Sequence, residues 1–64
     1  MARVLMVAFD GAQTLDVTGP SEVFATASRL SGRALYRVEV VTVGGGLIAT
    51  SSGLRLSTRA LEGV

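Results

Sequence analysis

Asp16 is the side chain whose type and position most clearly suggest chemistry. It lies between Leu15 and Val17, shortly after the apolar run Val4–Phe9. In open parallel α/β sheets, ligands bind in the crevice at the carboxyl ends of the strands. A carboxylate among apolar neighbours there is expected to be partly desolvated, which favours its protonated form and suits a general acid. The structural alternative is a helix cap, in which Asp16 accepts backbone N–H groups.

No complete catalytic machinery accompanies this carboxylate. Nucleophilic catalysis needs a serine or cysteine oriented by a base, and the 64 residues include no His, Lys or Cys. The same absences remove disulfides and the usual zinc ligands, so no metal site is expected.

Two small-residue runs have structural interpretations. Ser51-Ser52-Gly53 fits the turn of a hairpin. Gly44-Gly45-Gly46 is interpreted as a flexible connector, because no phosphate-loop pattern surrounds it. A dinucleotide fold would want three glycines after the first strand, where this chain has only Gly11, so no nicotinamide or flavin cofactor is expected.

Charge and hydropathy limit the expected partners. Six arginines oppose five acidic residues, and the arginines are spread along the chain, which predicts no binding to nucleic acid or anionic lipid by this segment. Glu22 and Glu39 are interpreted as solvated. Val4–Phe9 is too short for a signal segment or a membrane span, so a cytoplasmic chain is expected.

The hydrophobic pattern predicts a strand, a helix and a second strand. Val4–Phe9 is continuously apolar and Tyr36–Val43 is rich in β-branched residues, as in the buried strands of parallel sheets. Between them, Leu15–Leu30 has the three- and four-residue spacing of an amphipathic helix. This order is a βαβ unit with parallel strands and a right-handed crossover.

Pro20 affects where the helix should begin. Since proline breaks a helix interior, the regular helix is expected from Gly19 or Pro20 onward, after a separate turn over Leu15–Thr18. Ser31-Gly32 should end it. The predicted apolar face comprises Leu15, Gly19, Val23, Phe24, Ala27 and Leu30.

The rest of the chain predicts a small β-hairpin formed by Leu47–Thr50 and Leu54–Ser57. Thr58–Val64 resembles the start of a further connection. Buried parallel strands need helices on both faces, whereas this chain offers one long helix. We therefore expect an incomplete domain with one bare sheet face, which does not fold autonomously.

Several motifs together resemble one known family. They are Phe9-Asp10-Gly11, the run LDVTGP followed by Glu22-Val23-Phe24, Tyr36-Arg37-Val38, and the run SSGLRL. This set resembles the ThiJ/PfpI superfamily, which has the class I glutamine amidotransferase-like fold. The resemblance implies that residues 1–64 are the N-terminal fragment of one flavodoxin-like, doubly wound α/β domain about three times this length, a normal size for a single domain.

The resemblance also implies site residues. In the family, an acidic side chain at the start of the first helix lies beside a nucleophilic cysteine, and Asp16 occupies the matching position. The cysteine would lie beyond residue 64. Gly11 and Gly19 are the further ligand-binding residues expected, with no cofactor.

Two functions are implied, and a structural or chaperone-like role stays open beside them. The first is the ligand-sensing domain of an AraC-type transcriptional regulator, with DNA bound by a downstream helix-turn-helix. The second is a stand-alone enzyme similar to isonitrile hydratase. The long stretch Phe24–Tyr36 favours the regulator. The expected partners of the chain are the remainder of its own domain, a small-molecule ligand or substrate, and a second copy in a homodimer.

Overall fold

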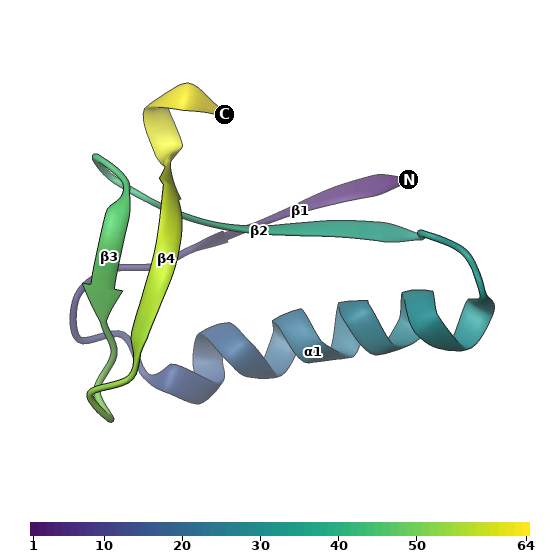
Figure 1. Cartoon of the computed structure of the whole chain (residues 1–64), viewed down its shortest axis with the longest axis horizontal. Helices are drawn as coiled ribbons and strands as arrows, with labels where there is room; N and C mark the ends of the chain where they lie inside the picture. Colours follow the sequence, from purple (N-terminus) through teal and green to yellow (C-terminus); the bar gives the residue numbers. More distant parts are fainter.

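The computed structural model describes residues 1–64 as a mixed α/β fold (Figure 1). The elements in chain order are β1 (Ala2–Val7), α1 (Thr14–Ser31), β2 (Tyr36–Thr42), β3 (Gly46–Ala49), β4 (Arg55–Ala60) and a final 3₁₀ turn, Leu61–Gly63. One four-stranded sheet has the order β1-β2-β4-β3. β2 pairs in parallel with β1 and β4, while β3 and β4 are antiparallel. The α/β class, the βαβ unit and the hairpin are therefore confirmed.

The first strand begins two residues earlier than predicted. Its register aligns Ala2 with Tyr36 and Val7 with Val41, so that β1 and β2 start together. Phe9 falls outside the strand and is 63% exposed. Apolar content alone marks the run but does not fix which backbone groups pair with a neighbouring strand.

The helix is continuous from Thr14, and the predicted break before Pro20 is wrong. Pro20 has no N–H, so it cannot donate to the carbonyl of Asp16 four residues earlier. The turns on either side carry extra hydrogen bonds, because the Thr18 hydroxyl donates to the Thr14 carbonyl at 3.0 Å and the Ser21 hydroxyl to the Val17 carbonyl at 2.7 Å. The loss of one backbone bond is thus tolerated within 18 helical residues.

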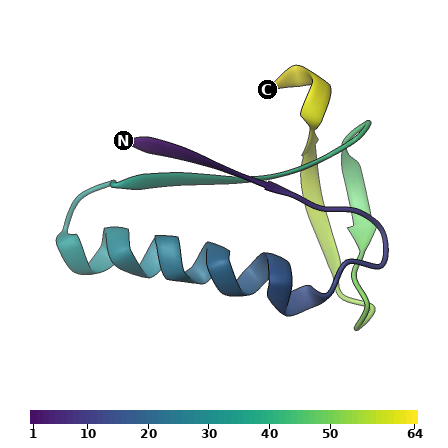
Figure 2. The same cartoon turned by 180° about the vertical axis from the view of Figure 1, so that it is seen from behind.

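α1 covers one face of the β1–β2 pair (Figures 1 and 2). Val17 is buried against the core, and the Phe24 ring meets the Tyr36 ring edge to face with 4.9 Å between centroids. Ser28 accepts the N–H groups of Leu35 and Tyr36, each at 3.2 Å, and so fixes the connection into β2.

Part of the predicted apolar face of the helix points to solvent instead. Leu15, Val23 and Leu30 are 77%, 66% and 82% exposed. A helix resting on a two-stranded ribbon buries only the arc that faces the strands, and Val17 and Phe24 occupy that arc. The three- and four-residue spacing predicted the helix correctly, but its apolar residues extend over more of the helix surface than the sheet can cover.

The glycine run after β2 forms a fixed turn, which corrects its interpretation as a flexible connector. Gly44, Gly45 and Gly46 all have positive φ angles, of 80°, 71° and 90°. A Cβ on Gly45 would lie 2.9 Å from the backbone nitrogen of Ala60. Both carboxylate oxygens of Glu62 accept the Gly44 N–H at 3.1 Å, which lowers the pKa of that carboxyl.

β4 continues to Ala60, where the sequence predicted a new connection. Its last residues pair with β2, with Arg59 beside Val41 and Ala60 beside Thr42. This short parallel contact brings the hairpin into the same sheet as the βαβ unit. The pairing partner of a strand lies far away in sequence, so local periodicity does not indicate it.

The opposite face of the β1–β2 ribbon is covered by no helix (Figures 1 and 2). Side chains alternate between faces along a strand, and residues in parallel register share a face. Since Tyr36 and Val40 contact the helix side, the alternate residues of β2, Arg37, Glu39 and Val41, and their register partners point away from the helix. We call this surface the open face; it comprises Arg3, Leu5, Val7, Arg37, Glu39, Val41 and, from β4, Arg59. Val41 and Glu39 are nevertheless buried within it.

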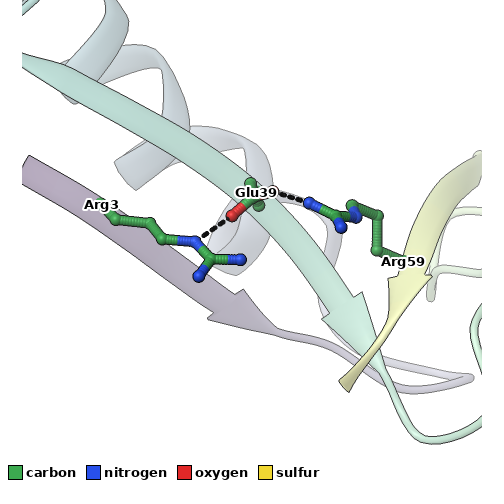
Figure 3. A network of polar contacts seen from close by, with 3 residues as sticks. All are labelled: Arg3, Glu39 and Arg59. Carbon is green, nitrogen blue, oxygen red and sulfur yellow. Dashed lines mark hydrogen bonds and ion pairs between the residues drawn. The ribbon is translucent and has the colours of Figure 1, made fainter. Parts of the chain in front are cut away.

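Glu39 on the open face is buried, contrary to the expectation that it is solvated. The residue is only 9% exposed. Arg3 Nε donates to one carboxylate oxygen and an Arg59 guanidinium N–H donates to the other (Figure 3). The hydrogen bond from Arg3 holds the pKa of Glu39 below its usual value; desolvation opposes this shift, and Arg59 adds to it.

This lowered pKa predicts acid-sensitive pairing of β1, β2 and β4. Above the usual carboxyl pKa of about 4.5, Glu39 is ionised in the folded and unfolded chain and its stabilisation is complete. As the pH falls below that value, the unfolded chain takes up the proton first, and stability is lost until the folded-state pKa is passed. Amide hydrogen-exchange protection of β1 and β2, corrected for intrinsic rates, should therefore fall between pH 5 and pH 3.

Glu39→Gln should reduce protection at pH 7 and flatten this pH dependence, leaving the contribution of Glu62. Glu22→Gln is the matched control, because Glu22 is exposed and lies 4.0 Å from Arg29 on the same helix. An unchanged pH profile in Glu39→Gln would contradict the assigned role.

Candidate functional site

The candidate site lies where three segments meet: the loop after β1, the first turn of α1, and the β3–β4 turn. Backbone hydrogen bonds hold the loop against the hairpin. The Gly11 N–H donates to the Ala49 carbonyl at 2.8 Å, and the Ser51 N–H donates to the Ala12 carbonyl at 2.9 Å. The Asp10 carboxylate accepts the Ala49 N–H at 2.9 Å. Asp10 therefore does more than form a local turn, since it joins the loop to β3.

Three hydroxyl groups meet beside this loop. The Thr14 hydroxyl donates to the Thr50 hydroxyl at 2.8 Å and lies 2.6 Å from the Ser52 hydroxyl. Thr50 is buried and donates to the Leu54 carbonyl at 2.8 Å. Gly53, with φ of 87°, completes the turn, so the hairpin-turn interpretation of Ser51-Ser52-Gly53 is confirmed.

Sequence reasoning did not find this hydroxyl cluster. The available signal was a threonine at the start of the helix together with Thr50-Ser51-Ser52 in a turn. Thr14 and Thr50 are 36 residues apart, so their contact depends on the hairpin packing beside the start of α1. The cluster joins the helix to the hairpin through side chains as well as backbone.

Asp16 lies in the first turn of α1 and is exposed to solvent. The expected partial burial is therefore not observed. The alternative of a helix cap is not observed either: Gln13 is the N-cap residue without a side-chain cap bond, and the Asp16 carboxylate accepts no hydrogen bond. The carboxylate is left unused by the fold, near the positive end of the helix dipole.

The two glycines predicted with Asp16 occupy different places. Gly19 follows three residues later on α1, so it is a neighbour of Asp16 on the helix surface. Gly11 adopts a φ of 88° in the loop, and its N–H is already bound to the Ala49 carbonyl. The structure thus brings Asp16 and Gly19 together and gives Gly11 a structural contact.

A shallow groove runs along the outer side of α1 beside Asp16. It is lined by Leu15, Thr18, Gly19, Glu22, Val23 and Thr26. Since Gly19 has no side chain, and a Cβ there would meet no atom within 4 Å, the backbone is accessible at this point. The groove combines apolar side chains with the hydroxyl and carboxyl groups of a single helix face.

This arrangement supplies hydroxyl groups for polar recognition and the exposed carboxylates of Asp16 and Glu22. Asp16 and Thr14 are two residues apart on the helix, so the carboxylate and the hydroxyl cluster face different sides. No three His, Cys, Asp or Glu side chains lie together as a ligand set for a metal ion. The chain contains no helix that is both long and apolar enough to cross a bilayer.

Comparison with known proteins gives one similarity in sequence. The chain is 40% identical over 52 residues to a Streptomyces lividans protein described as "Uncharacterized protein in cpoL 5'region". The aligned segment covers 81% of this chain and 36% of that protein, so the chain spans about a third of the length of its relative. No protein-family model and no solved structure matches the chain.

The two aspartates near the site should respond differently to substitution. Asp16→Asn should change the free energy of unfolding by less than about 0.5 kcal/mol, because its carboxylate holds no backbone group. Asp10→Ala should cost about 1–3 kcal/mol by removing the acceptor of the Ala49 N–H. Hydrogen-exchange protection of β3 measures both effects. A loss in Asp16→Asn equal to that in Asp10→Ala would restore the capping role.

Proposed function

We propose that this chain is the ligand-sensing part of an AraC-type transcriptional regulator, with DNA binding carried outside residues 1–64. The observation that carries the proposal is the free carboxylate of Asp16, exposed in the first turn of the helix that follows β1. The fold does not use this group, so it is available to a ligand. The 64 residues contain no Cys, His or Lys that would form a nucleophile and base with it.

The resemblance to the ThiJ/PfpI superfamily supports the same proposal. The run LDVTGP contains Asp16 and Gly19, which are neighbours on the surface of α1. The segment from Phe24 to Tyr36 resembles in its length the matching segment of the AraC-type regulators. The Phe24 and Tyr36 rings meet edge to face, and this contact gives the segment a packing role between helix and strand.

Ligand binding at Asp16 has a structural route to the rest of the chain. A small molecule with N–H or O–H donors would form charge-assisted hydrogen bonds to the carboxylate. The same helical turn contains Thr14, which contacts Thr50 and Ser52 in the hairpin. A shift of the first turn of α1 would therefore reach β3 and β4 through these hydroxyl groups.

An isonitrile hydratase-like enzyme is the second candidate. The cysteine thiol would add to the isonitrile carbon, which also takes up a proton, to give a thioimidate. Water would then add to that carbon and the thiol would leave, giving an N-substituted formamide. Asp16 would serve in proton transfer beside a cysteine nucleophile from outside residues 1–64. Because its carboxylate has no partner within residues 1–64, Asp16 is available to this candidate as well.

A gel-shift assay with the gene product that carries this chain tests the first function. Specific, salt-dependent binding to DNA from its own promoter region is expected, while residues 1–64 alone should give no shift. Hydration of an isonitrile without any promoter binding would instead establish the enzyme. If hydration occurs, Asp16→Asn should reduce it by at least about 100-fold, as for loss of a general acid. Arg33→Gln, in the exposed loop between α1 and β2, should leave it unchanged.

A further inference from the structure

The helical turn that carries Asp16 receives little support from α1 itself. Gln13, the N-cap residue, forms no side-chain cap bond to the backbone of this turn. Pro20 has no N–H to donate to the Asp16 carbonyl, so one bond between this turn and the next is missing. The Asp16 N–H is bound to the Gln13 carbonyl at 3.0 Å, three residues back. The position of this turn relative to the sheet therefore depends on contacts from outside α1.

These contacts include a chain of three hydroxyl groups whose direction is fixed. A hydroxyl group has a single proton to donate. Thr50 donates its proton to the Leu54 carbonyl at 2.8 Å, so it accepts the proton of Thr14, also at 2.8 Å. Because the Thr14 proton is then used, the Ser52 hydroxyl, 2.6 Å away, donates to Thr14. The donors thus follow one direction, from Ser52 in the turn to the Leu54 carbonyl.

Thr14 is the member of this chain that belongs to α1. Its hydroxyl accepts one hydrogen bond and donates another, and consecutive hydrogen bonds of this kind strengthen each other. Thr50 is 5% exposed, so its bond with Thr14 is shielded from water. Asp16 follows two residues later in the same helical turn, so a movement of Thr14 would move Asp16 as well.

We infer that Thr14 is a positioning residue for Asp16, because it ties the first turn of α1 to the β3–β4 turn and so holds the carboxylate in place. The inference rests on the proposed role of Asp16 in ligand binding. Thr14 acts through Asp16 and does not contact the ligand itself, since the hydroxyl cluster and the carboxylate face different sides of the helix.

The test is hydrogen exchange, resolved to single amides, on the whole gene product that carries this chain. Thr14→Val keeps the shape of the side chain and removes both hydroxyl bonds. The two amides to follow lie on either side of the link: the Asp16 N–H, and the Ser51 N–H, which donates to the Ala12 carbonyl at 2.9 Å. Both should exchange about fivefold faster in Thr14→Val, as for the loss of one net hydrogen bond.

Two variants and one distant amide serve as controls. Thr14→Ser keeps the hydroxyl group and should restore the protection of both amides. Thr26→Val makes the same chemical change further along α1, where the hydroxyl accepts a bond from exposed Arg29 at 3.2 Å, and should leave both amides unchanged. The Leu35 N–H, beyond the far end of α1, should exchange normally in Thr14→Val.

Four results would overturn the inference: unchanged exchange in Thr14→Val, no restoration in Thr14→Ser, an equal loss in Thr26→Val, or an equal acceleration at Leu35, which would show a general loss of stability. The exchange measurements need neither ligand nor DNA. A protein with the expected exchange pattern but without promoter binding or hydration would therefore refute the proposed function alone and leave Thr14 as a link between helix and hairpin.

Discussion

Glu39 is the constraint on which the arrangement of the sheet depends. Glu39 lies on β2, between β1 and β4, and its carboxylate binds one arginine from each of these neighbouring strands. The β2–β4 contact otherwise has only two register pairs, at Val41 and Thr42. A charge-assisted hydrogen bond is stronger than a neutral one, so the pair with Arg59 gives a short parallel contact a fixed position. The hairpin is placed beside the βαβ unit through this contact.

The position of the hairpin in turn determines the candidate site. One end of β4 is held by Glu39, and the β2–β3 turn next to it is held by the bond from Gly44 to Glu62. At the other end, Thr50 and Ser52 meet Thr14 at the start of α1. Both ends of the hairpin are thus fixed by polar groups, and the first turn of α1 is supported while Asp16 stays free.

The sequence allowed prediction of the elements better than of their contacts. Hydrophobic periodicity and glycine positions correctly indicated two parallel strands, a helix ending at Gly32 and a hairpin. These signals could not indicate that Glu39 is buried, because the partners of its carboxylate, Arg3 and Arg59, lie 36 and 20 residues away along the chain. Asp16 lies in the first turn of α1 and not in the separate turn predicted before Pro20. Its exposure depends on how α1 packs, which apolar neighbours in sequence do not determine.

The narrow width of the β1–β2 ribbon explains why both the helix and the sheet retain exposed apolar side chains. A helix touches a narrow ribbon along one arc, so Leu15 and Val23 point outward although they belong to the apolar pattern of α1. A ribbon has two faces, and one helix covers one of them, so Leu5 and Val7 point outward on the other. The outer side of α1 offers backbone access at Gly19 beside acidic Glu22, whereas the open face offers arginines. The two apolar surfaces therefore differ in the charge of the side chains that flank them.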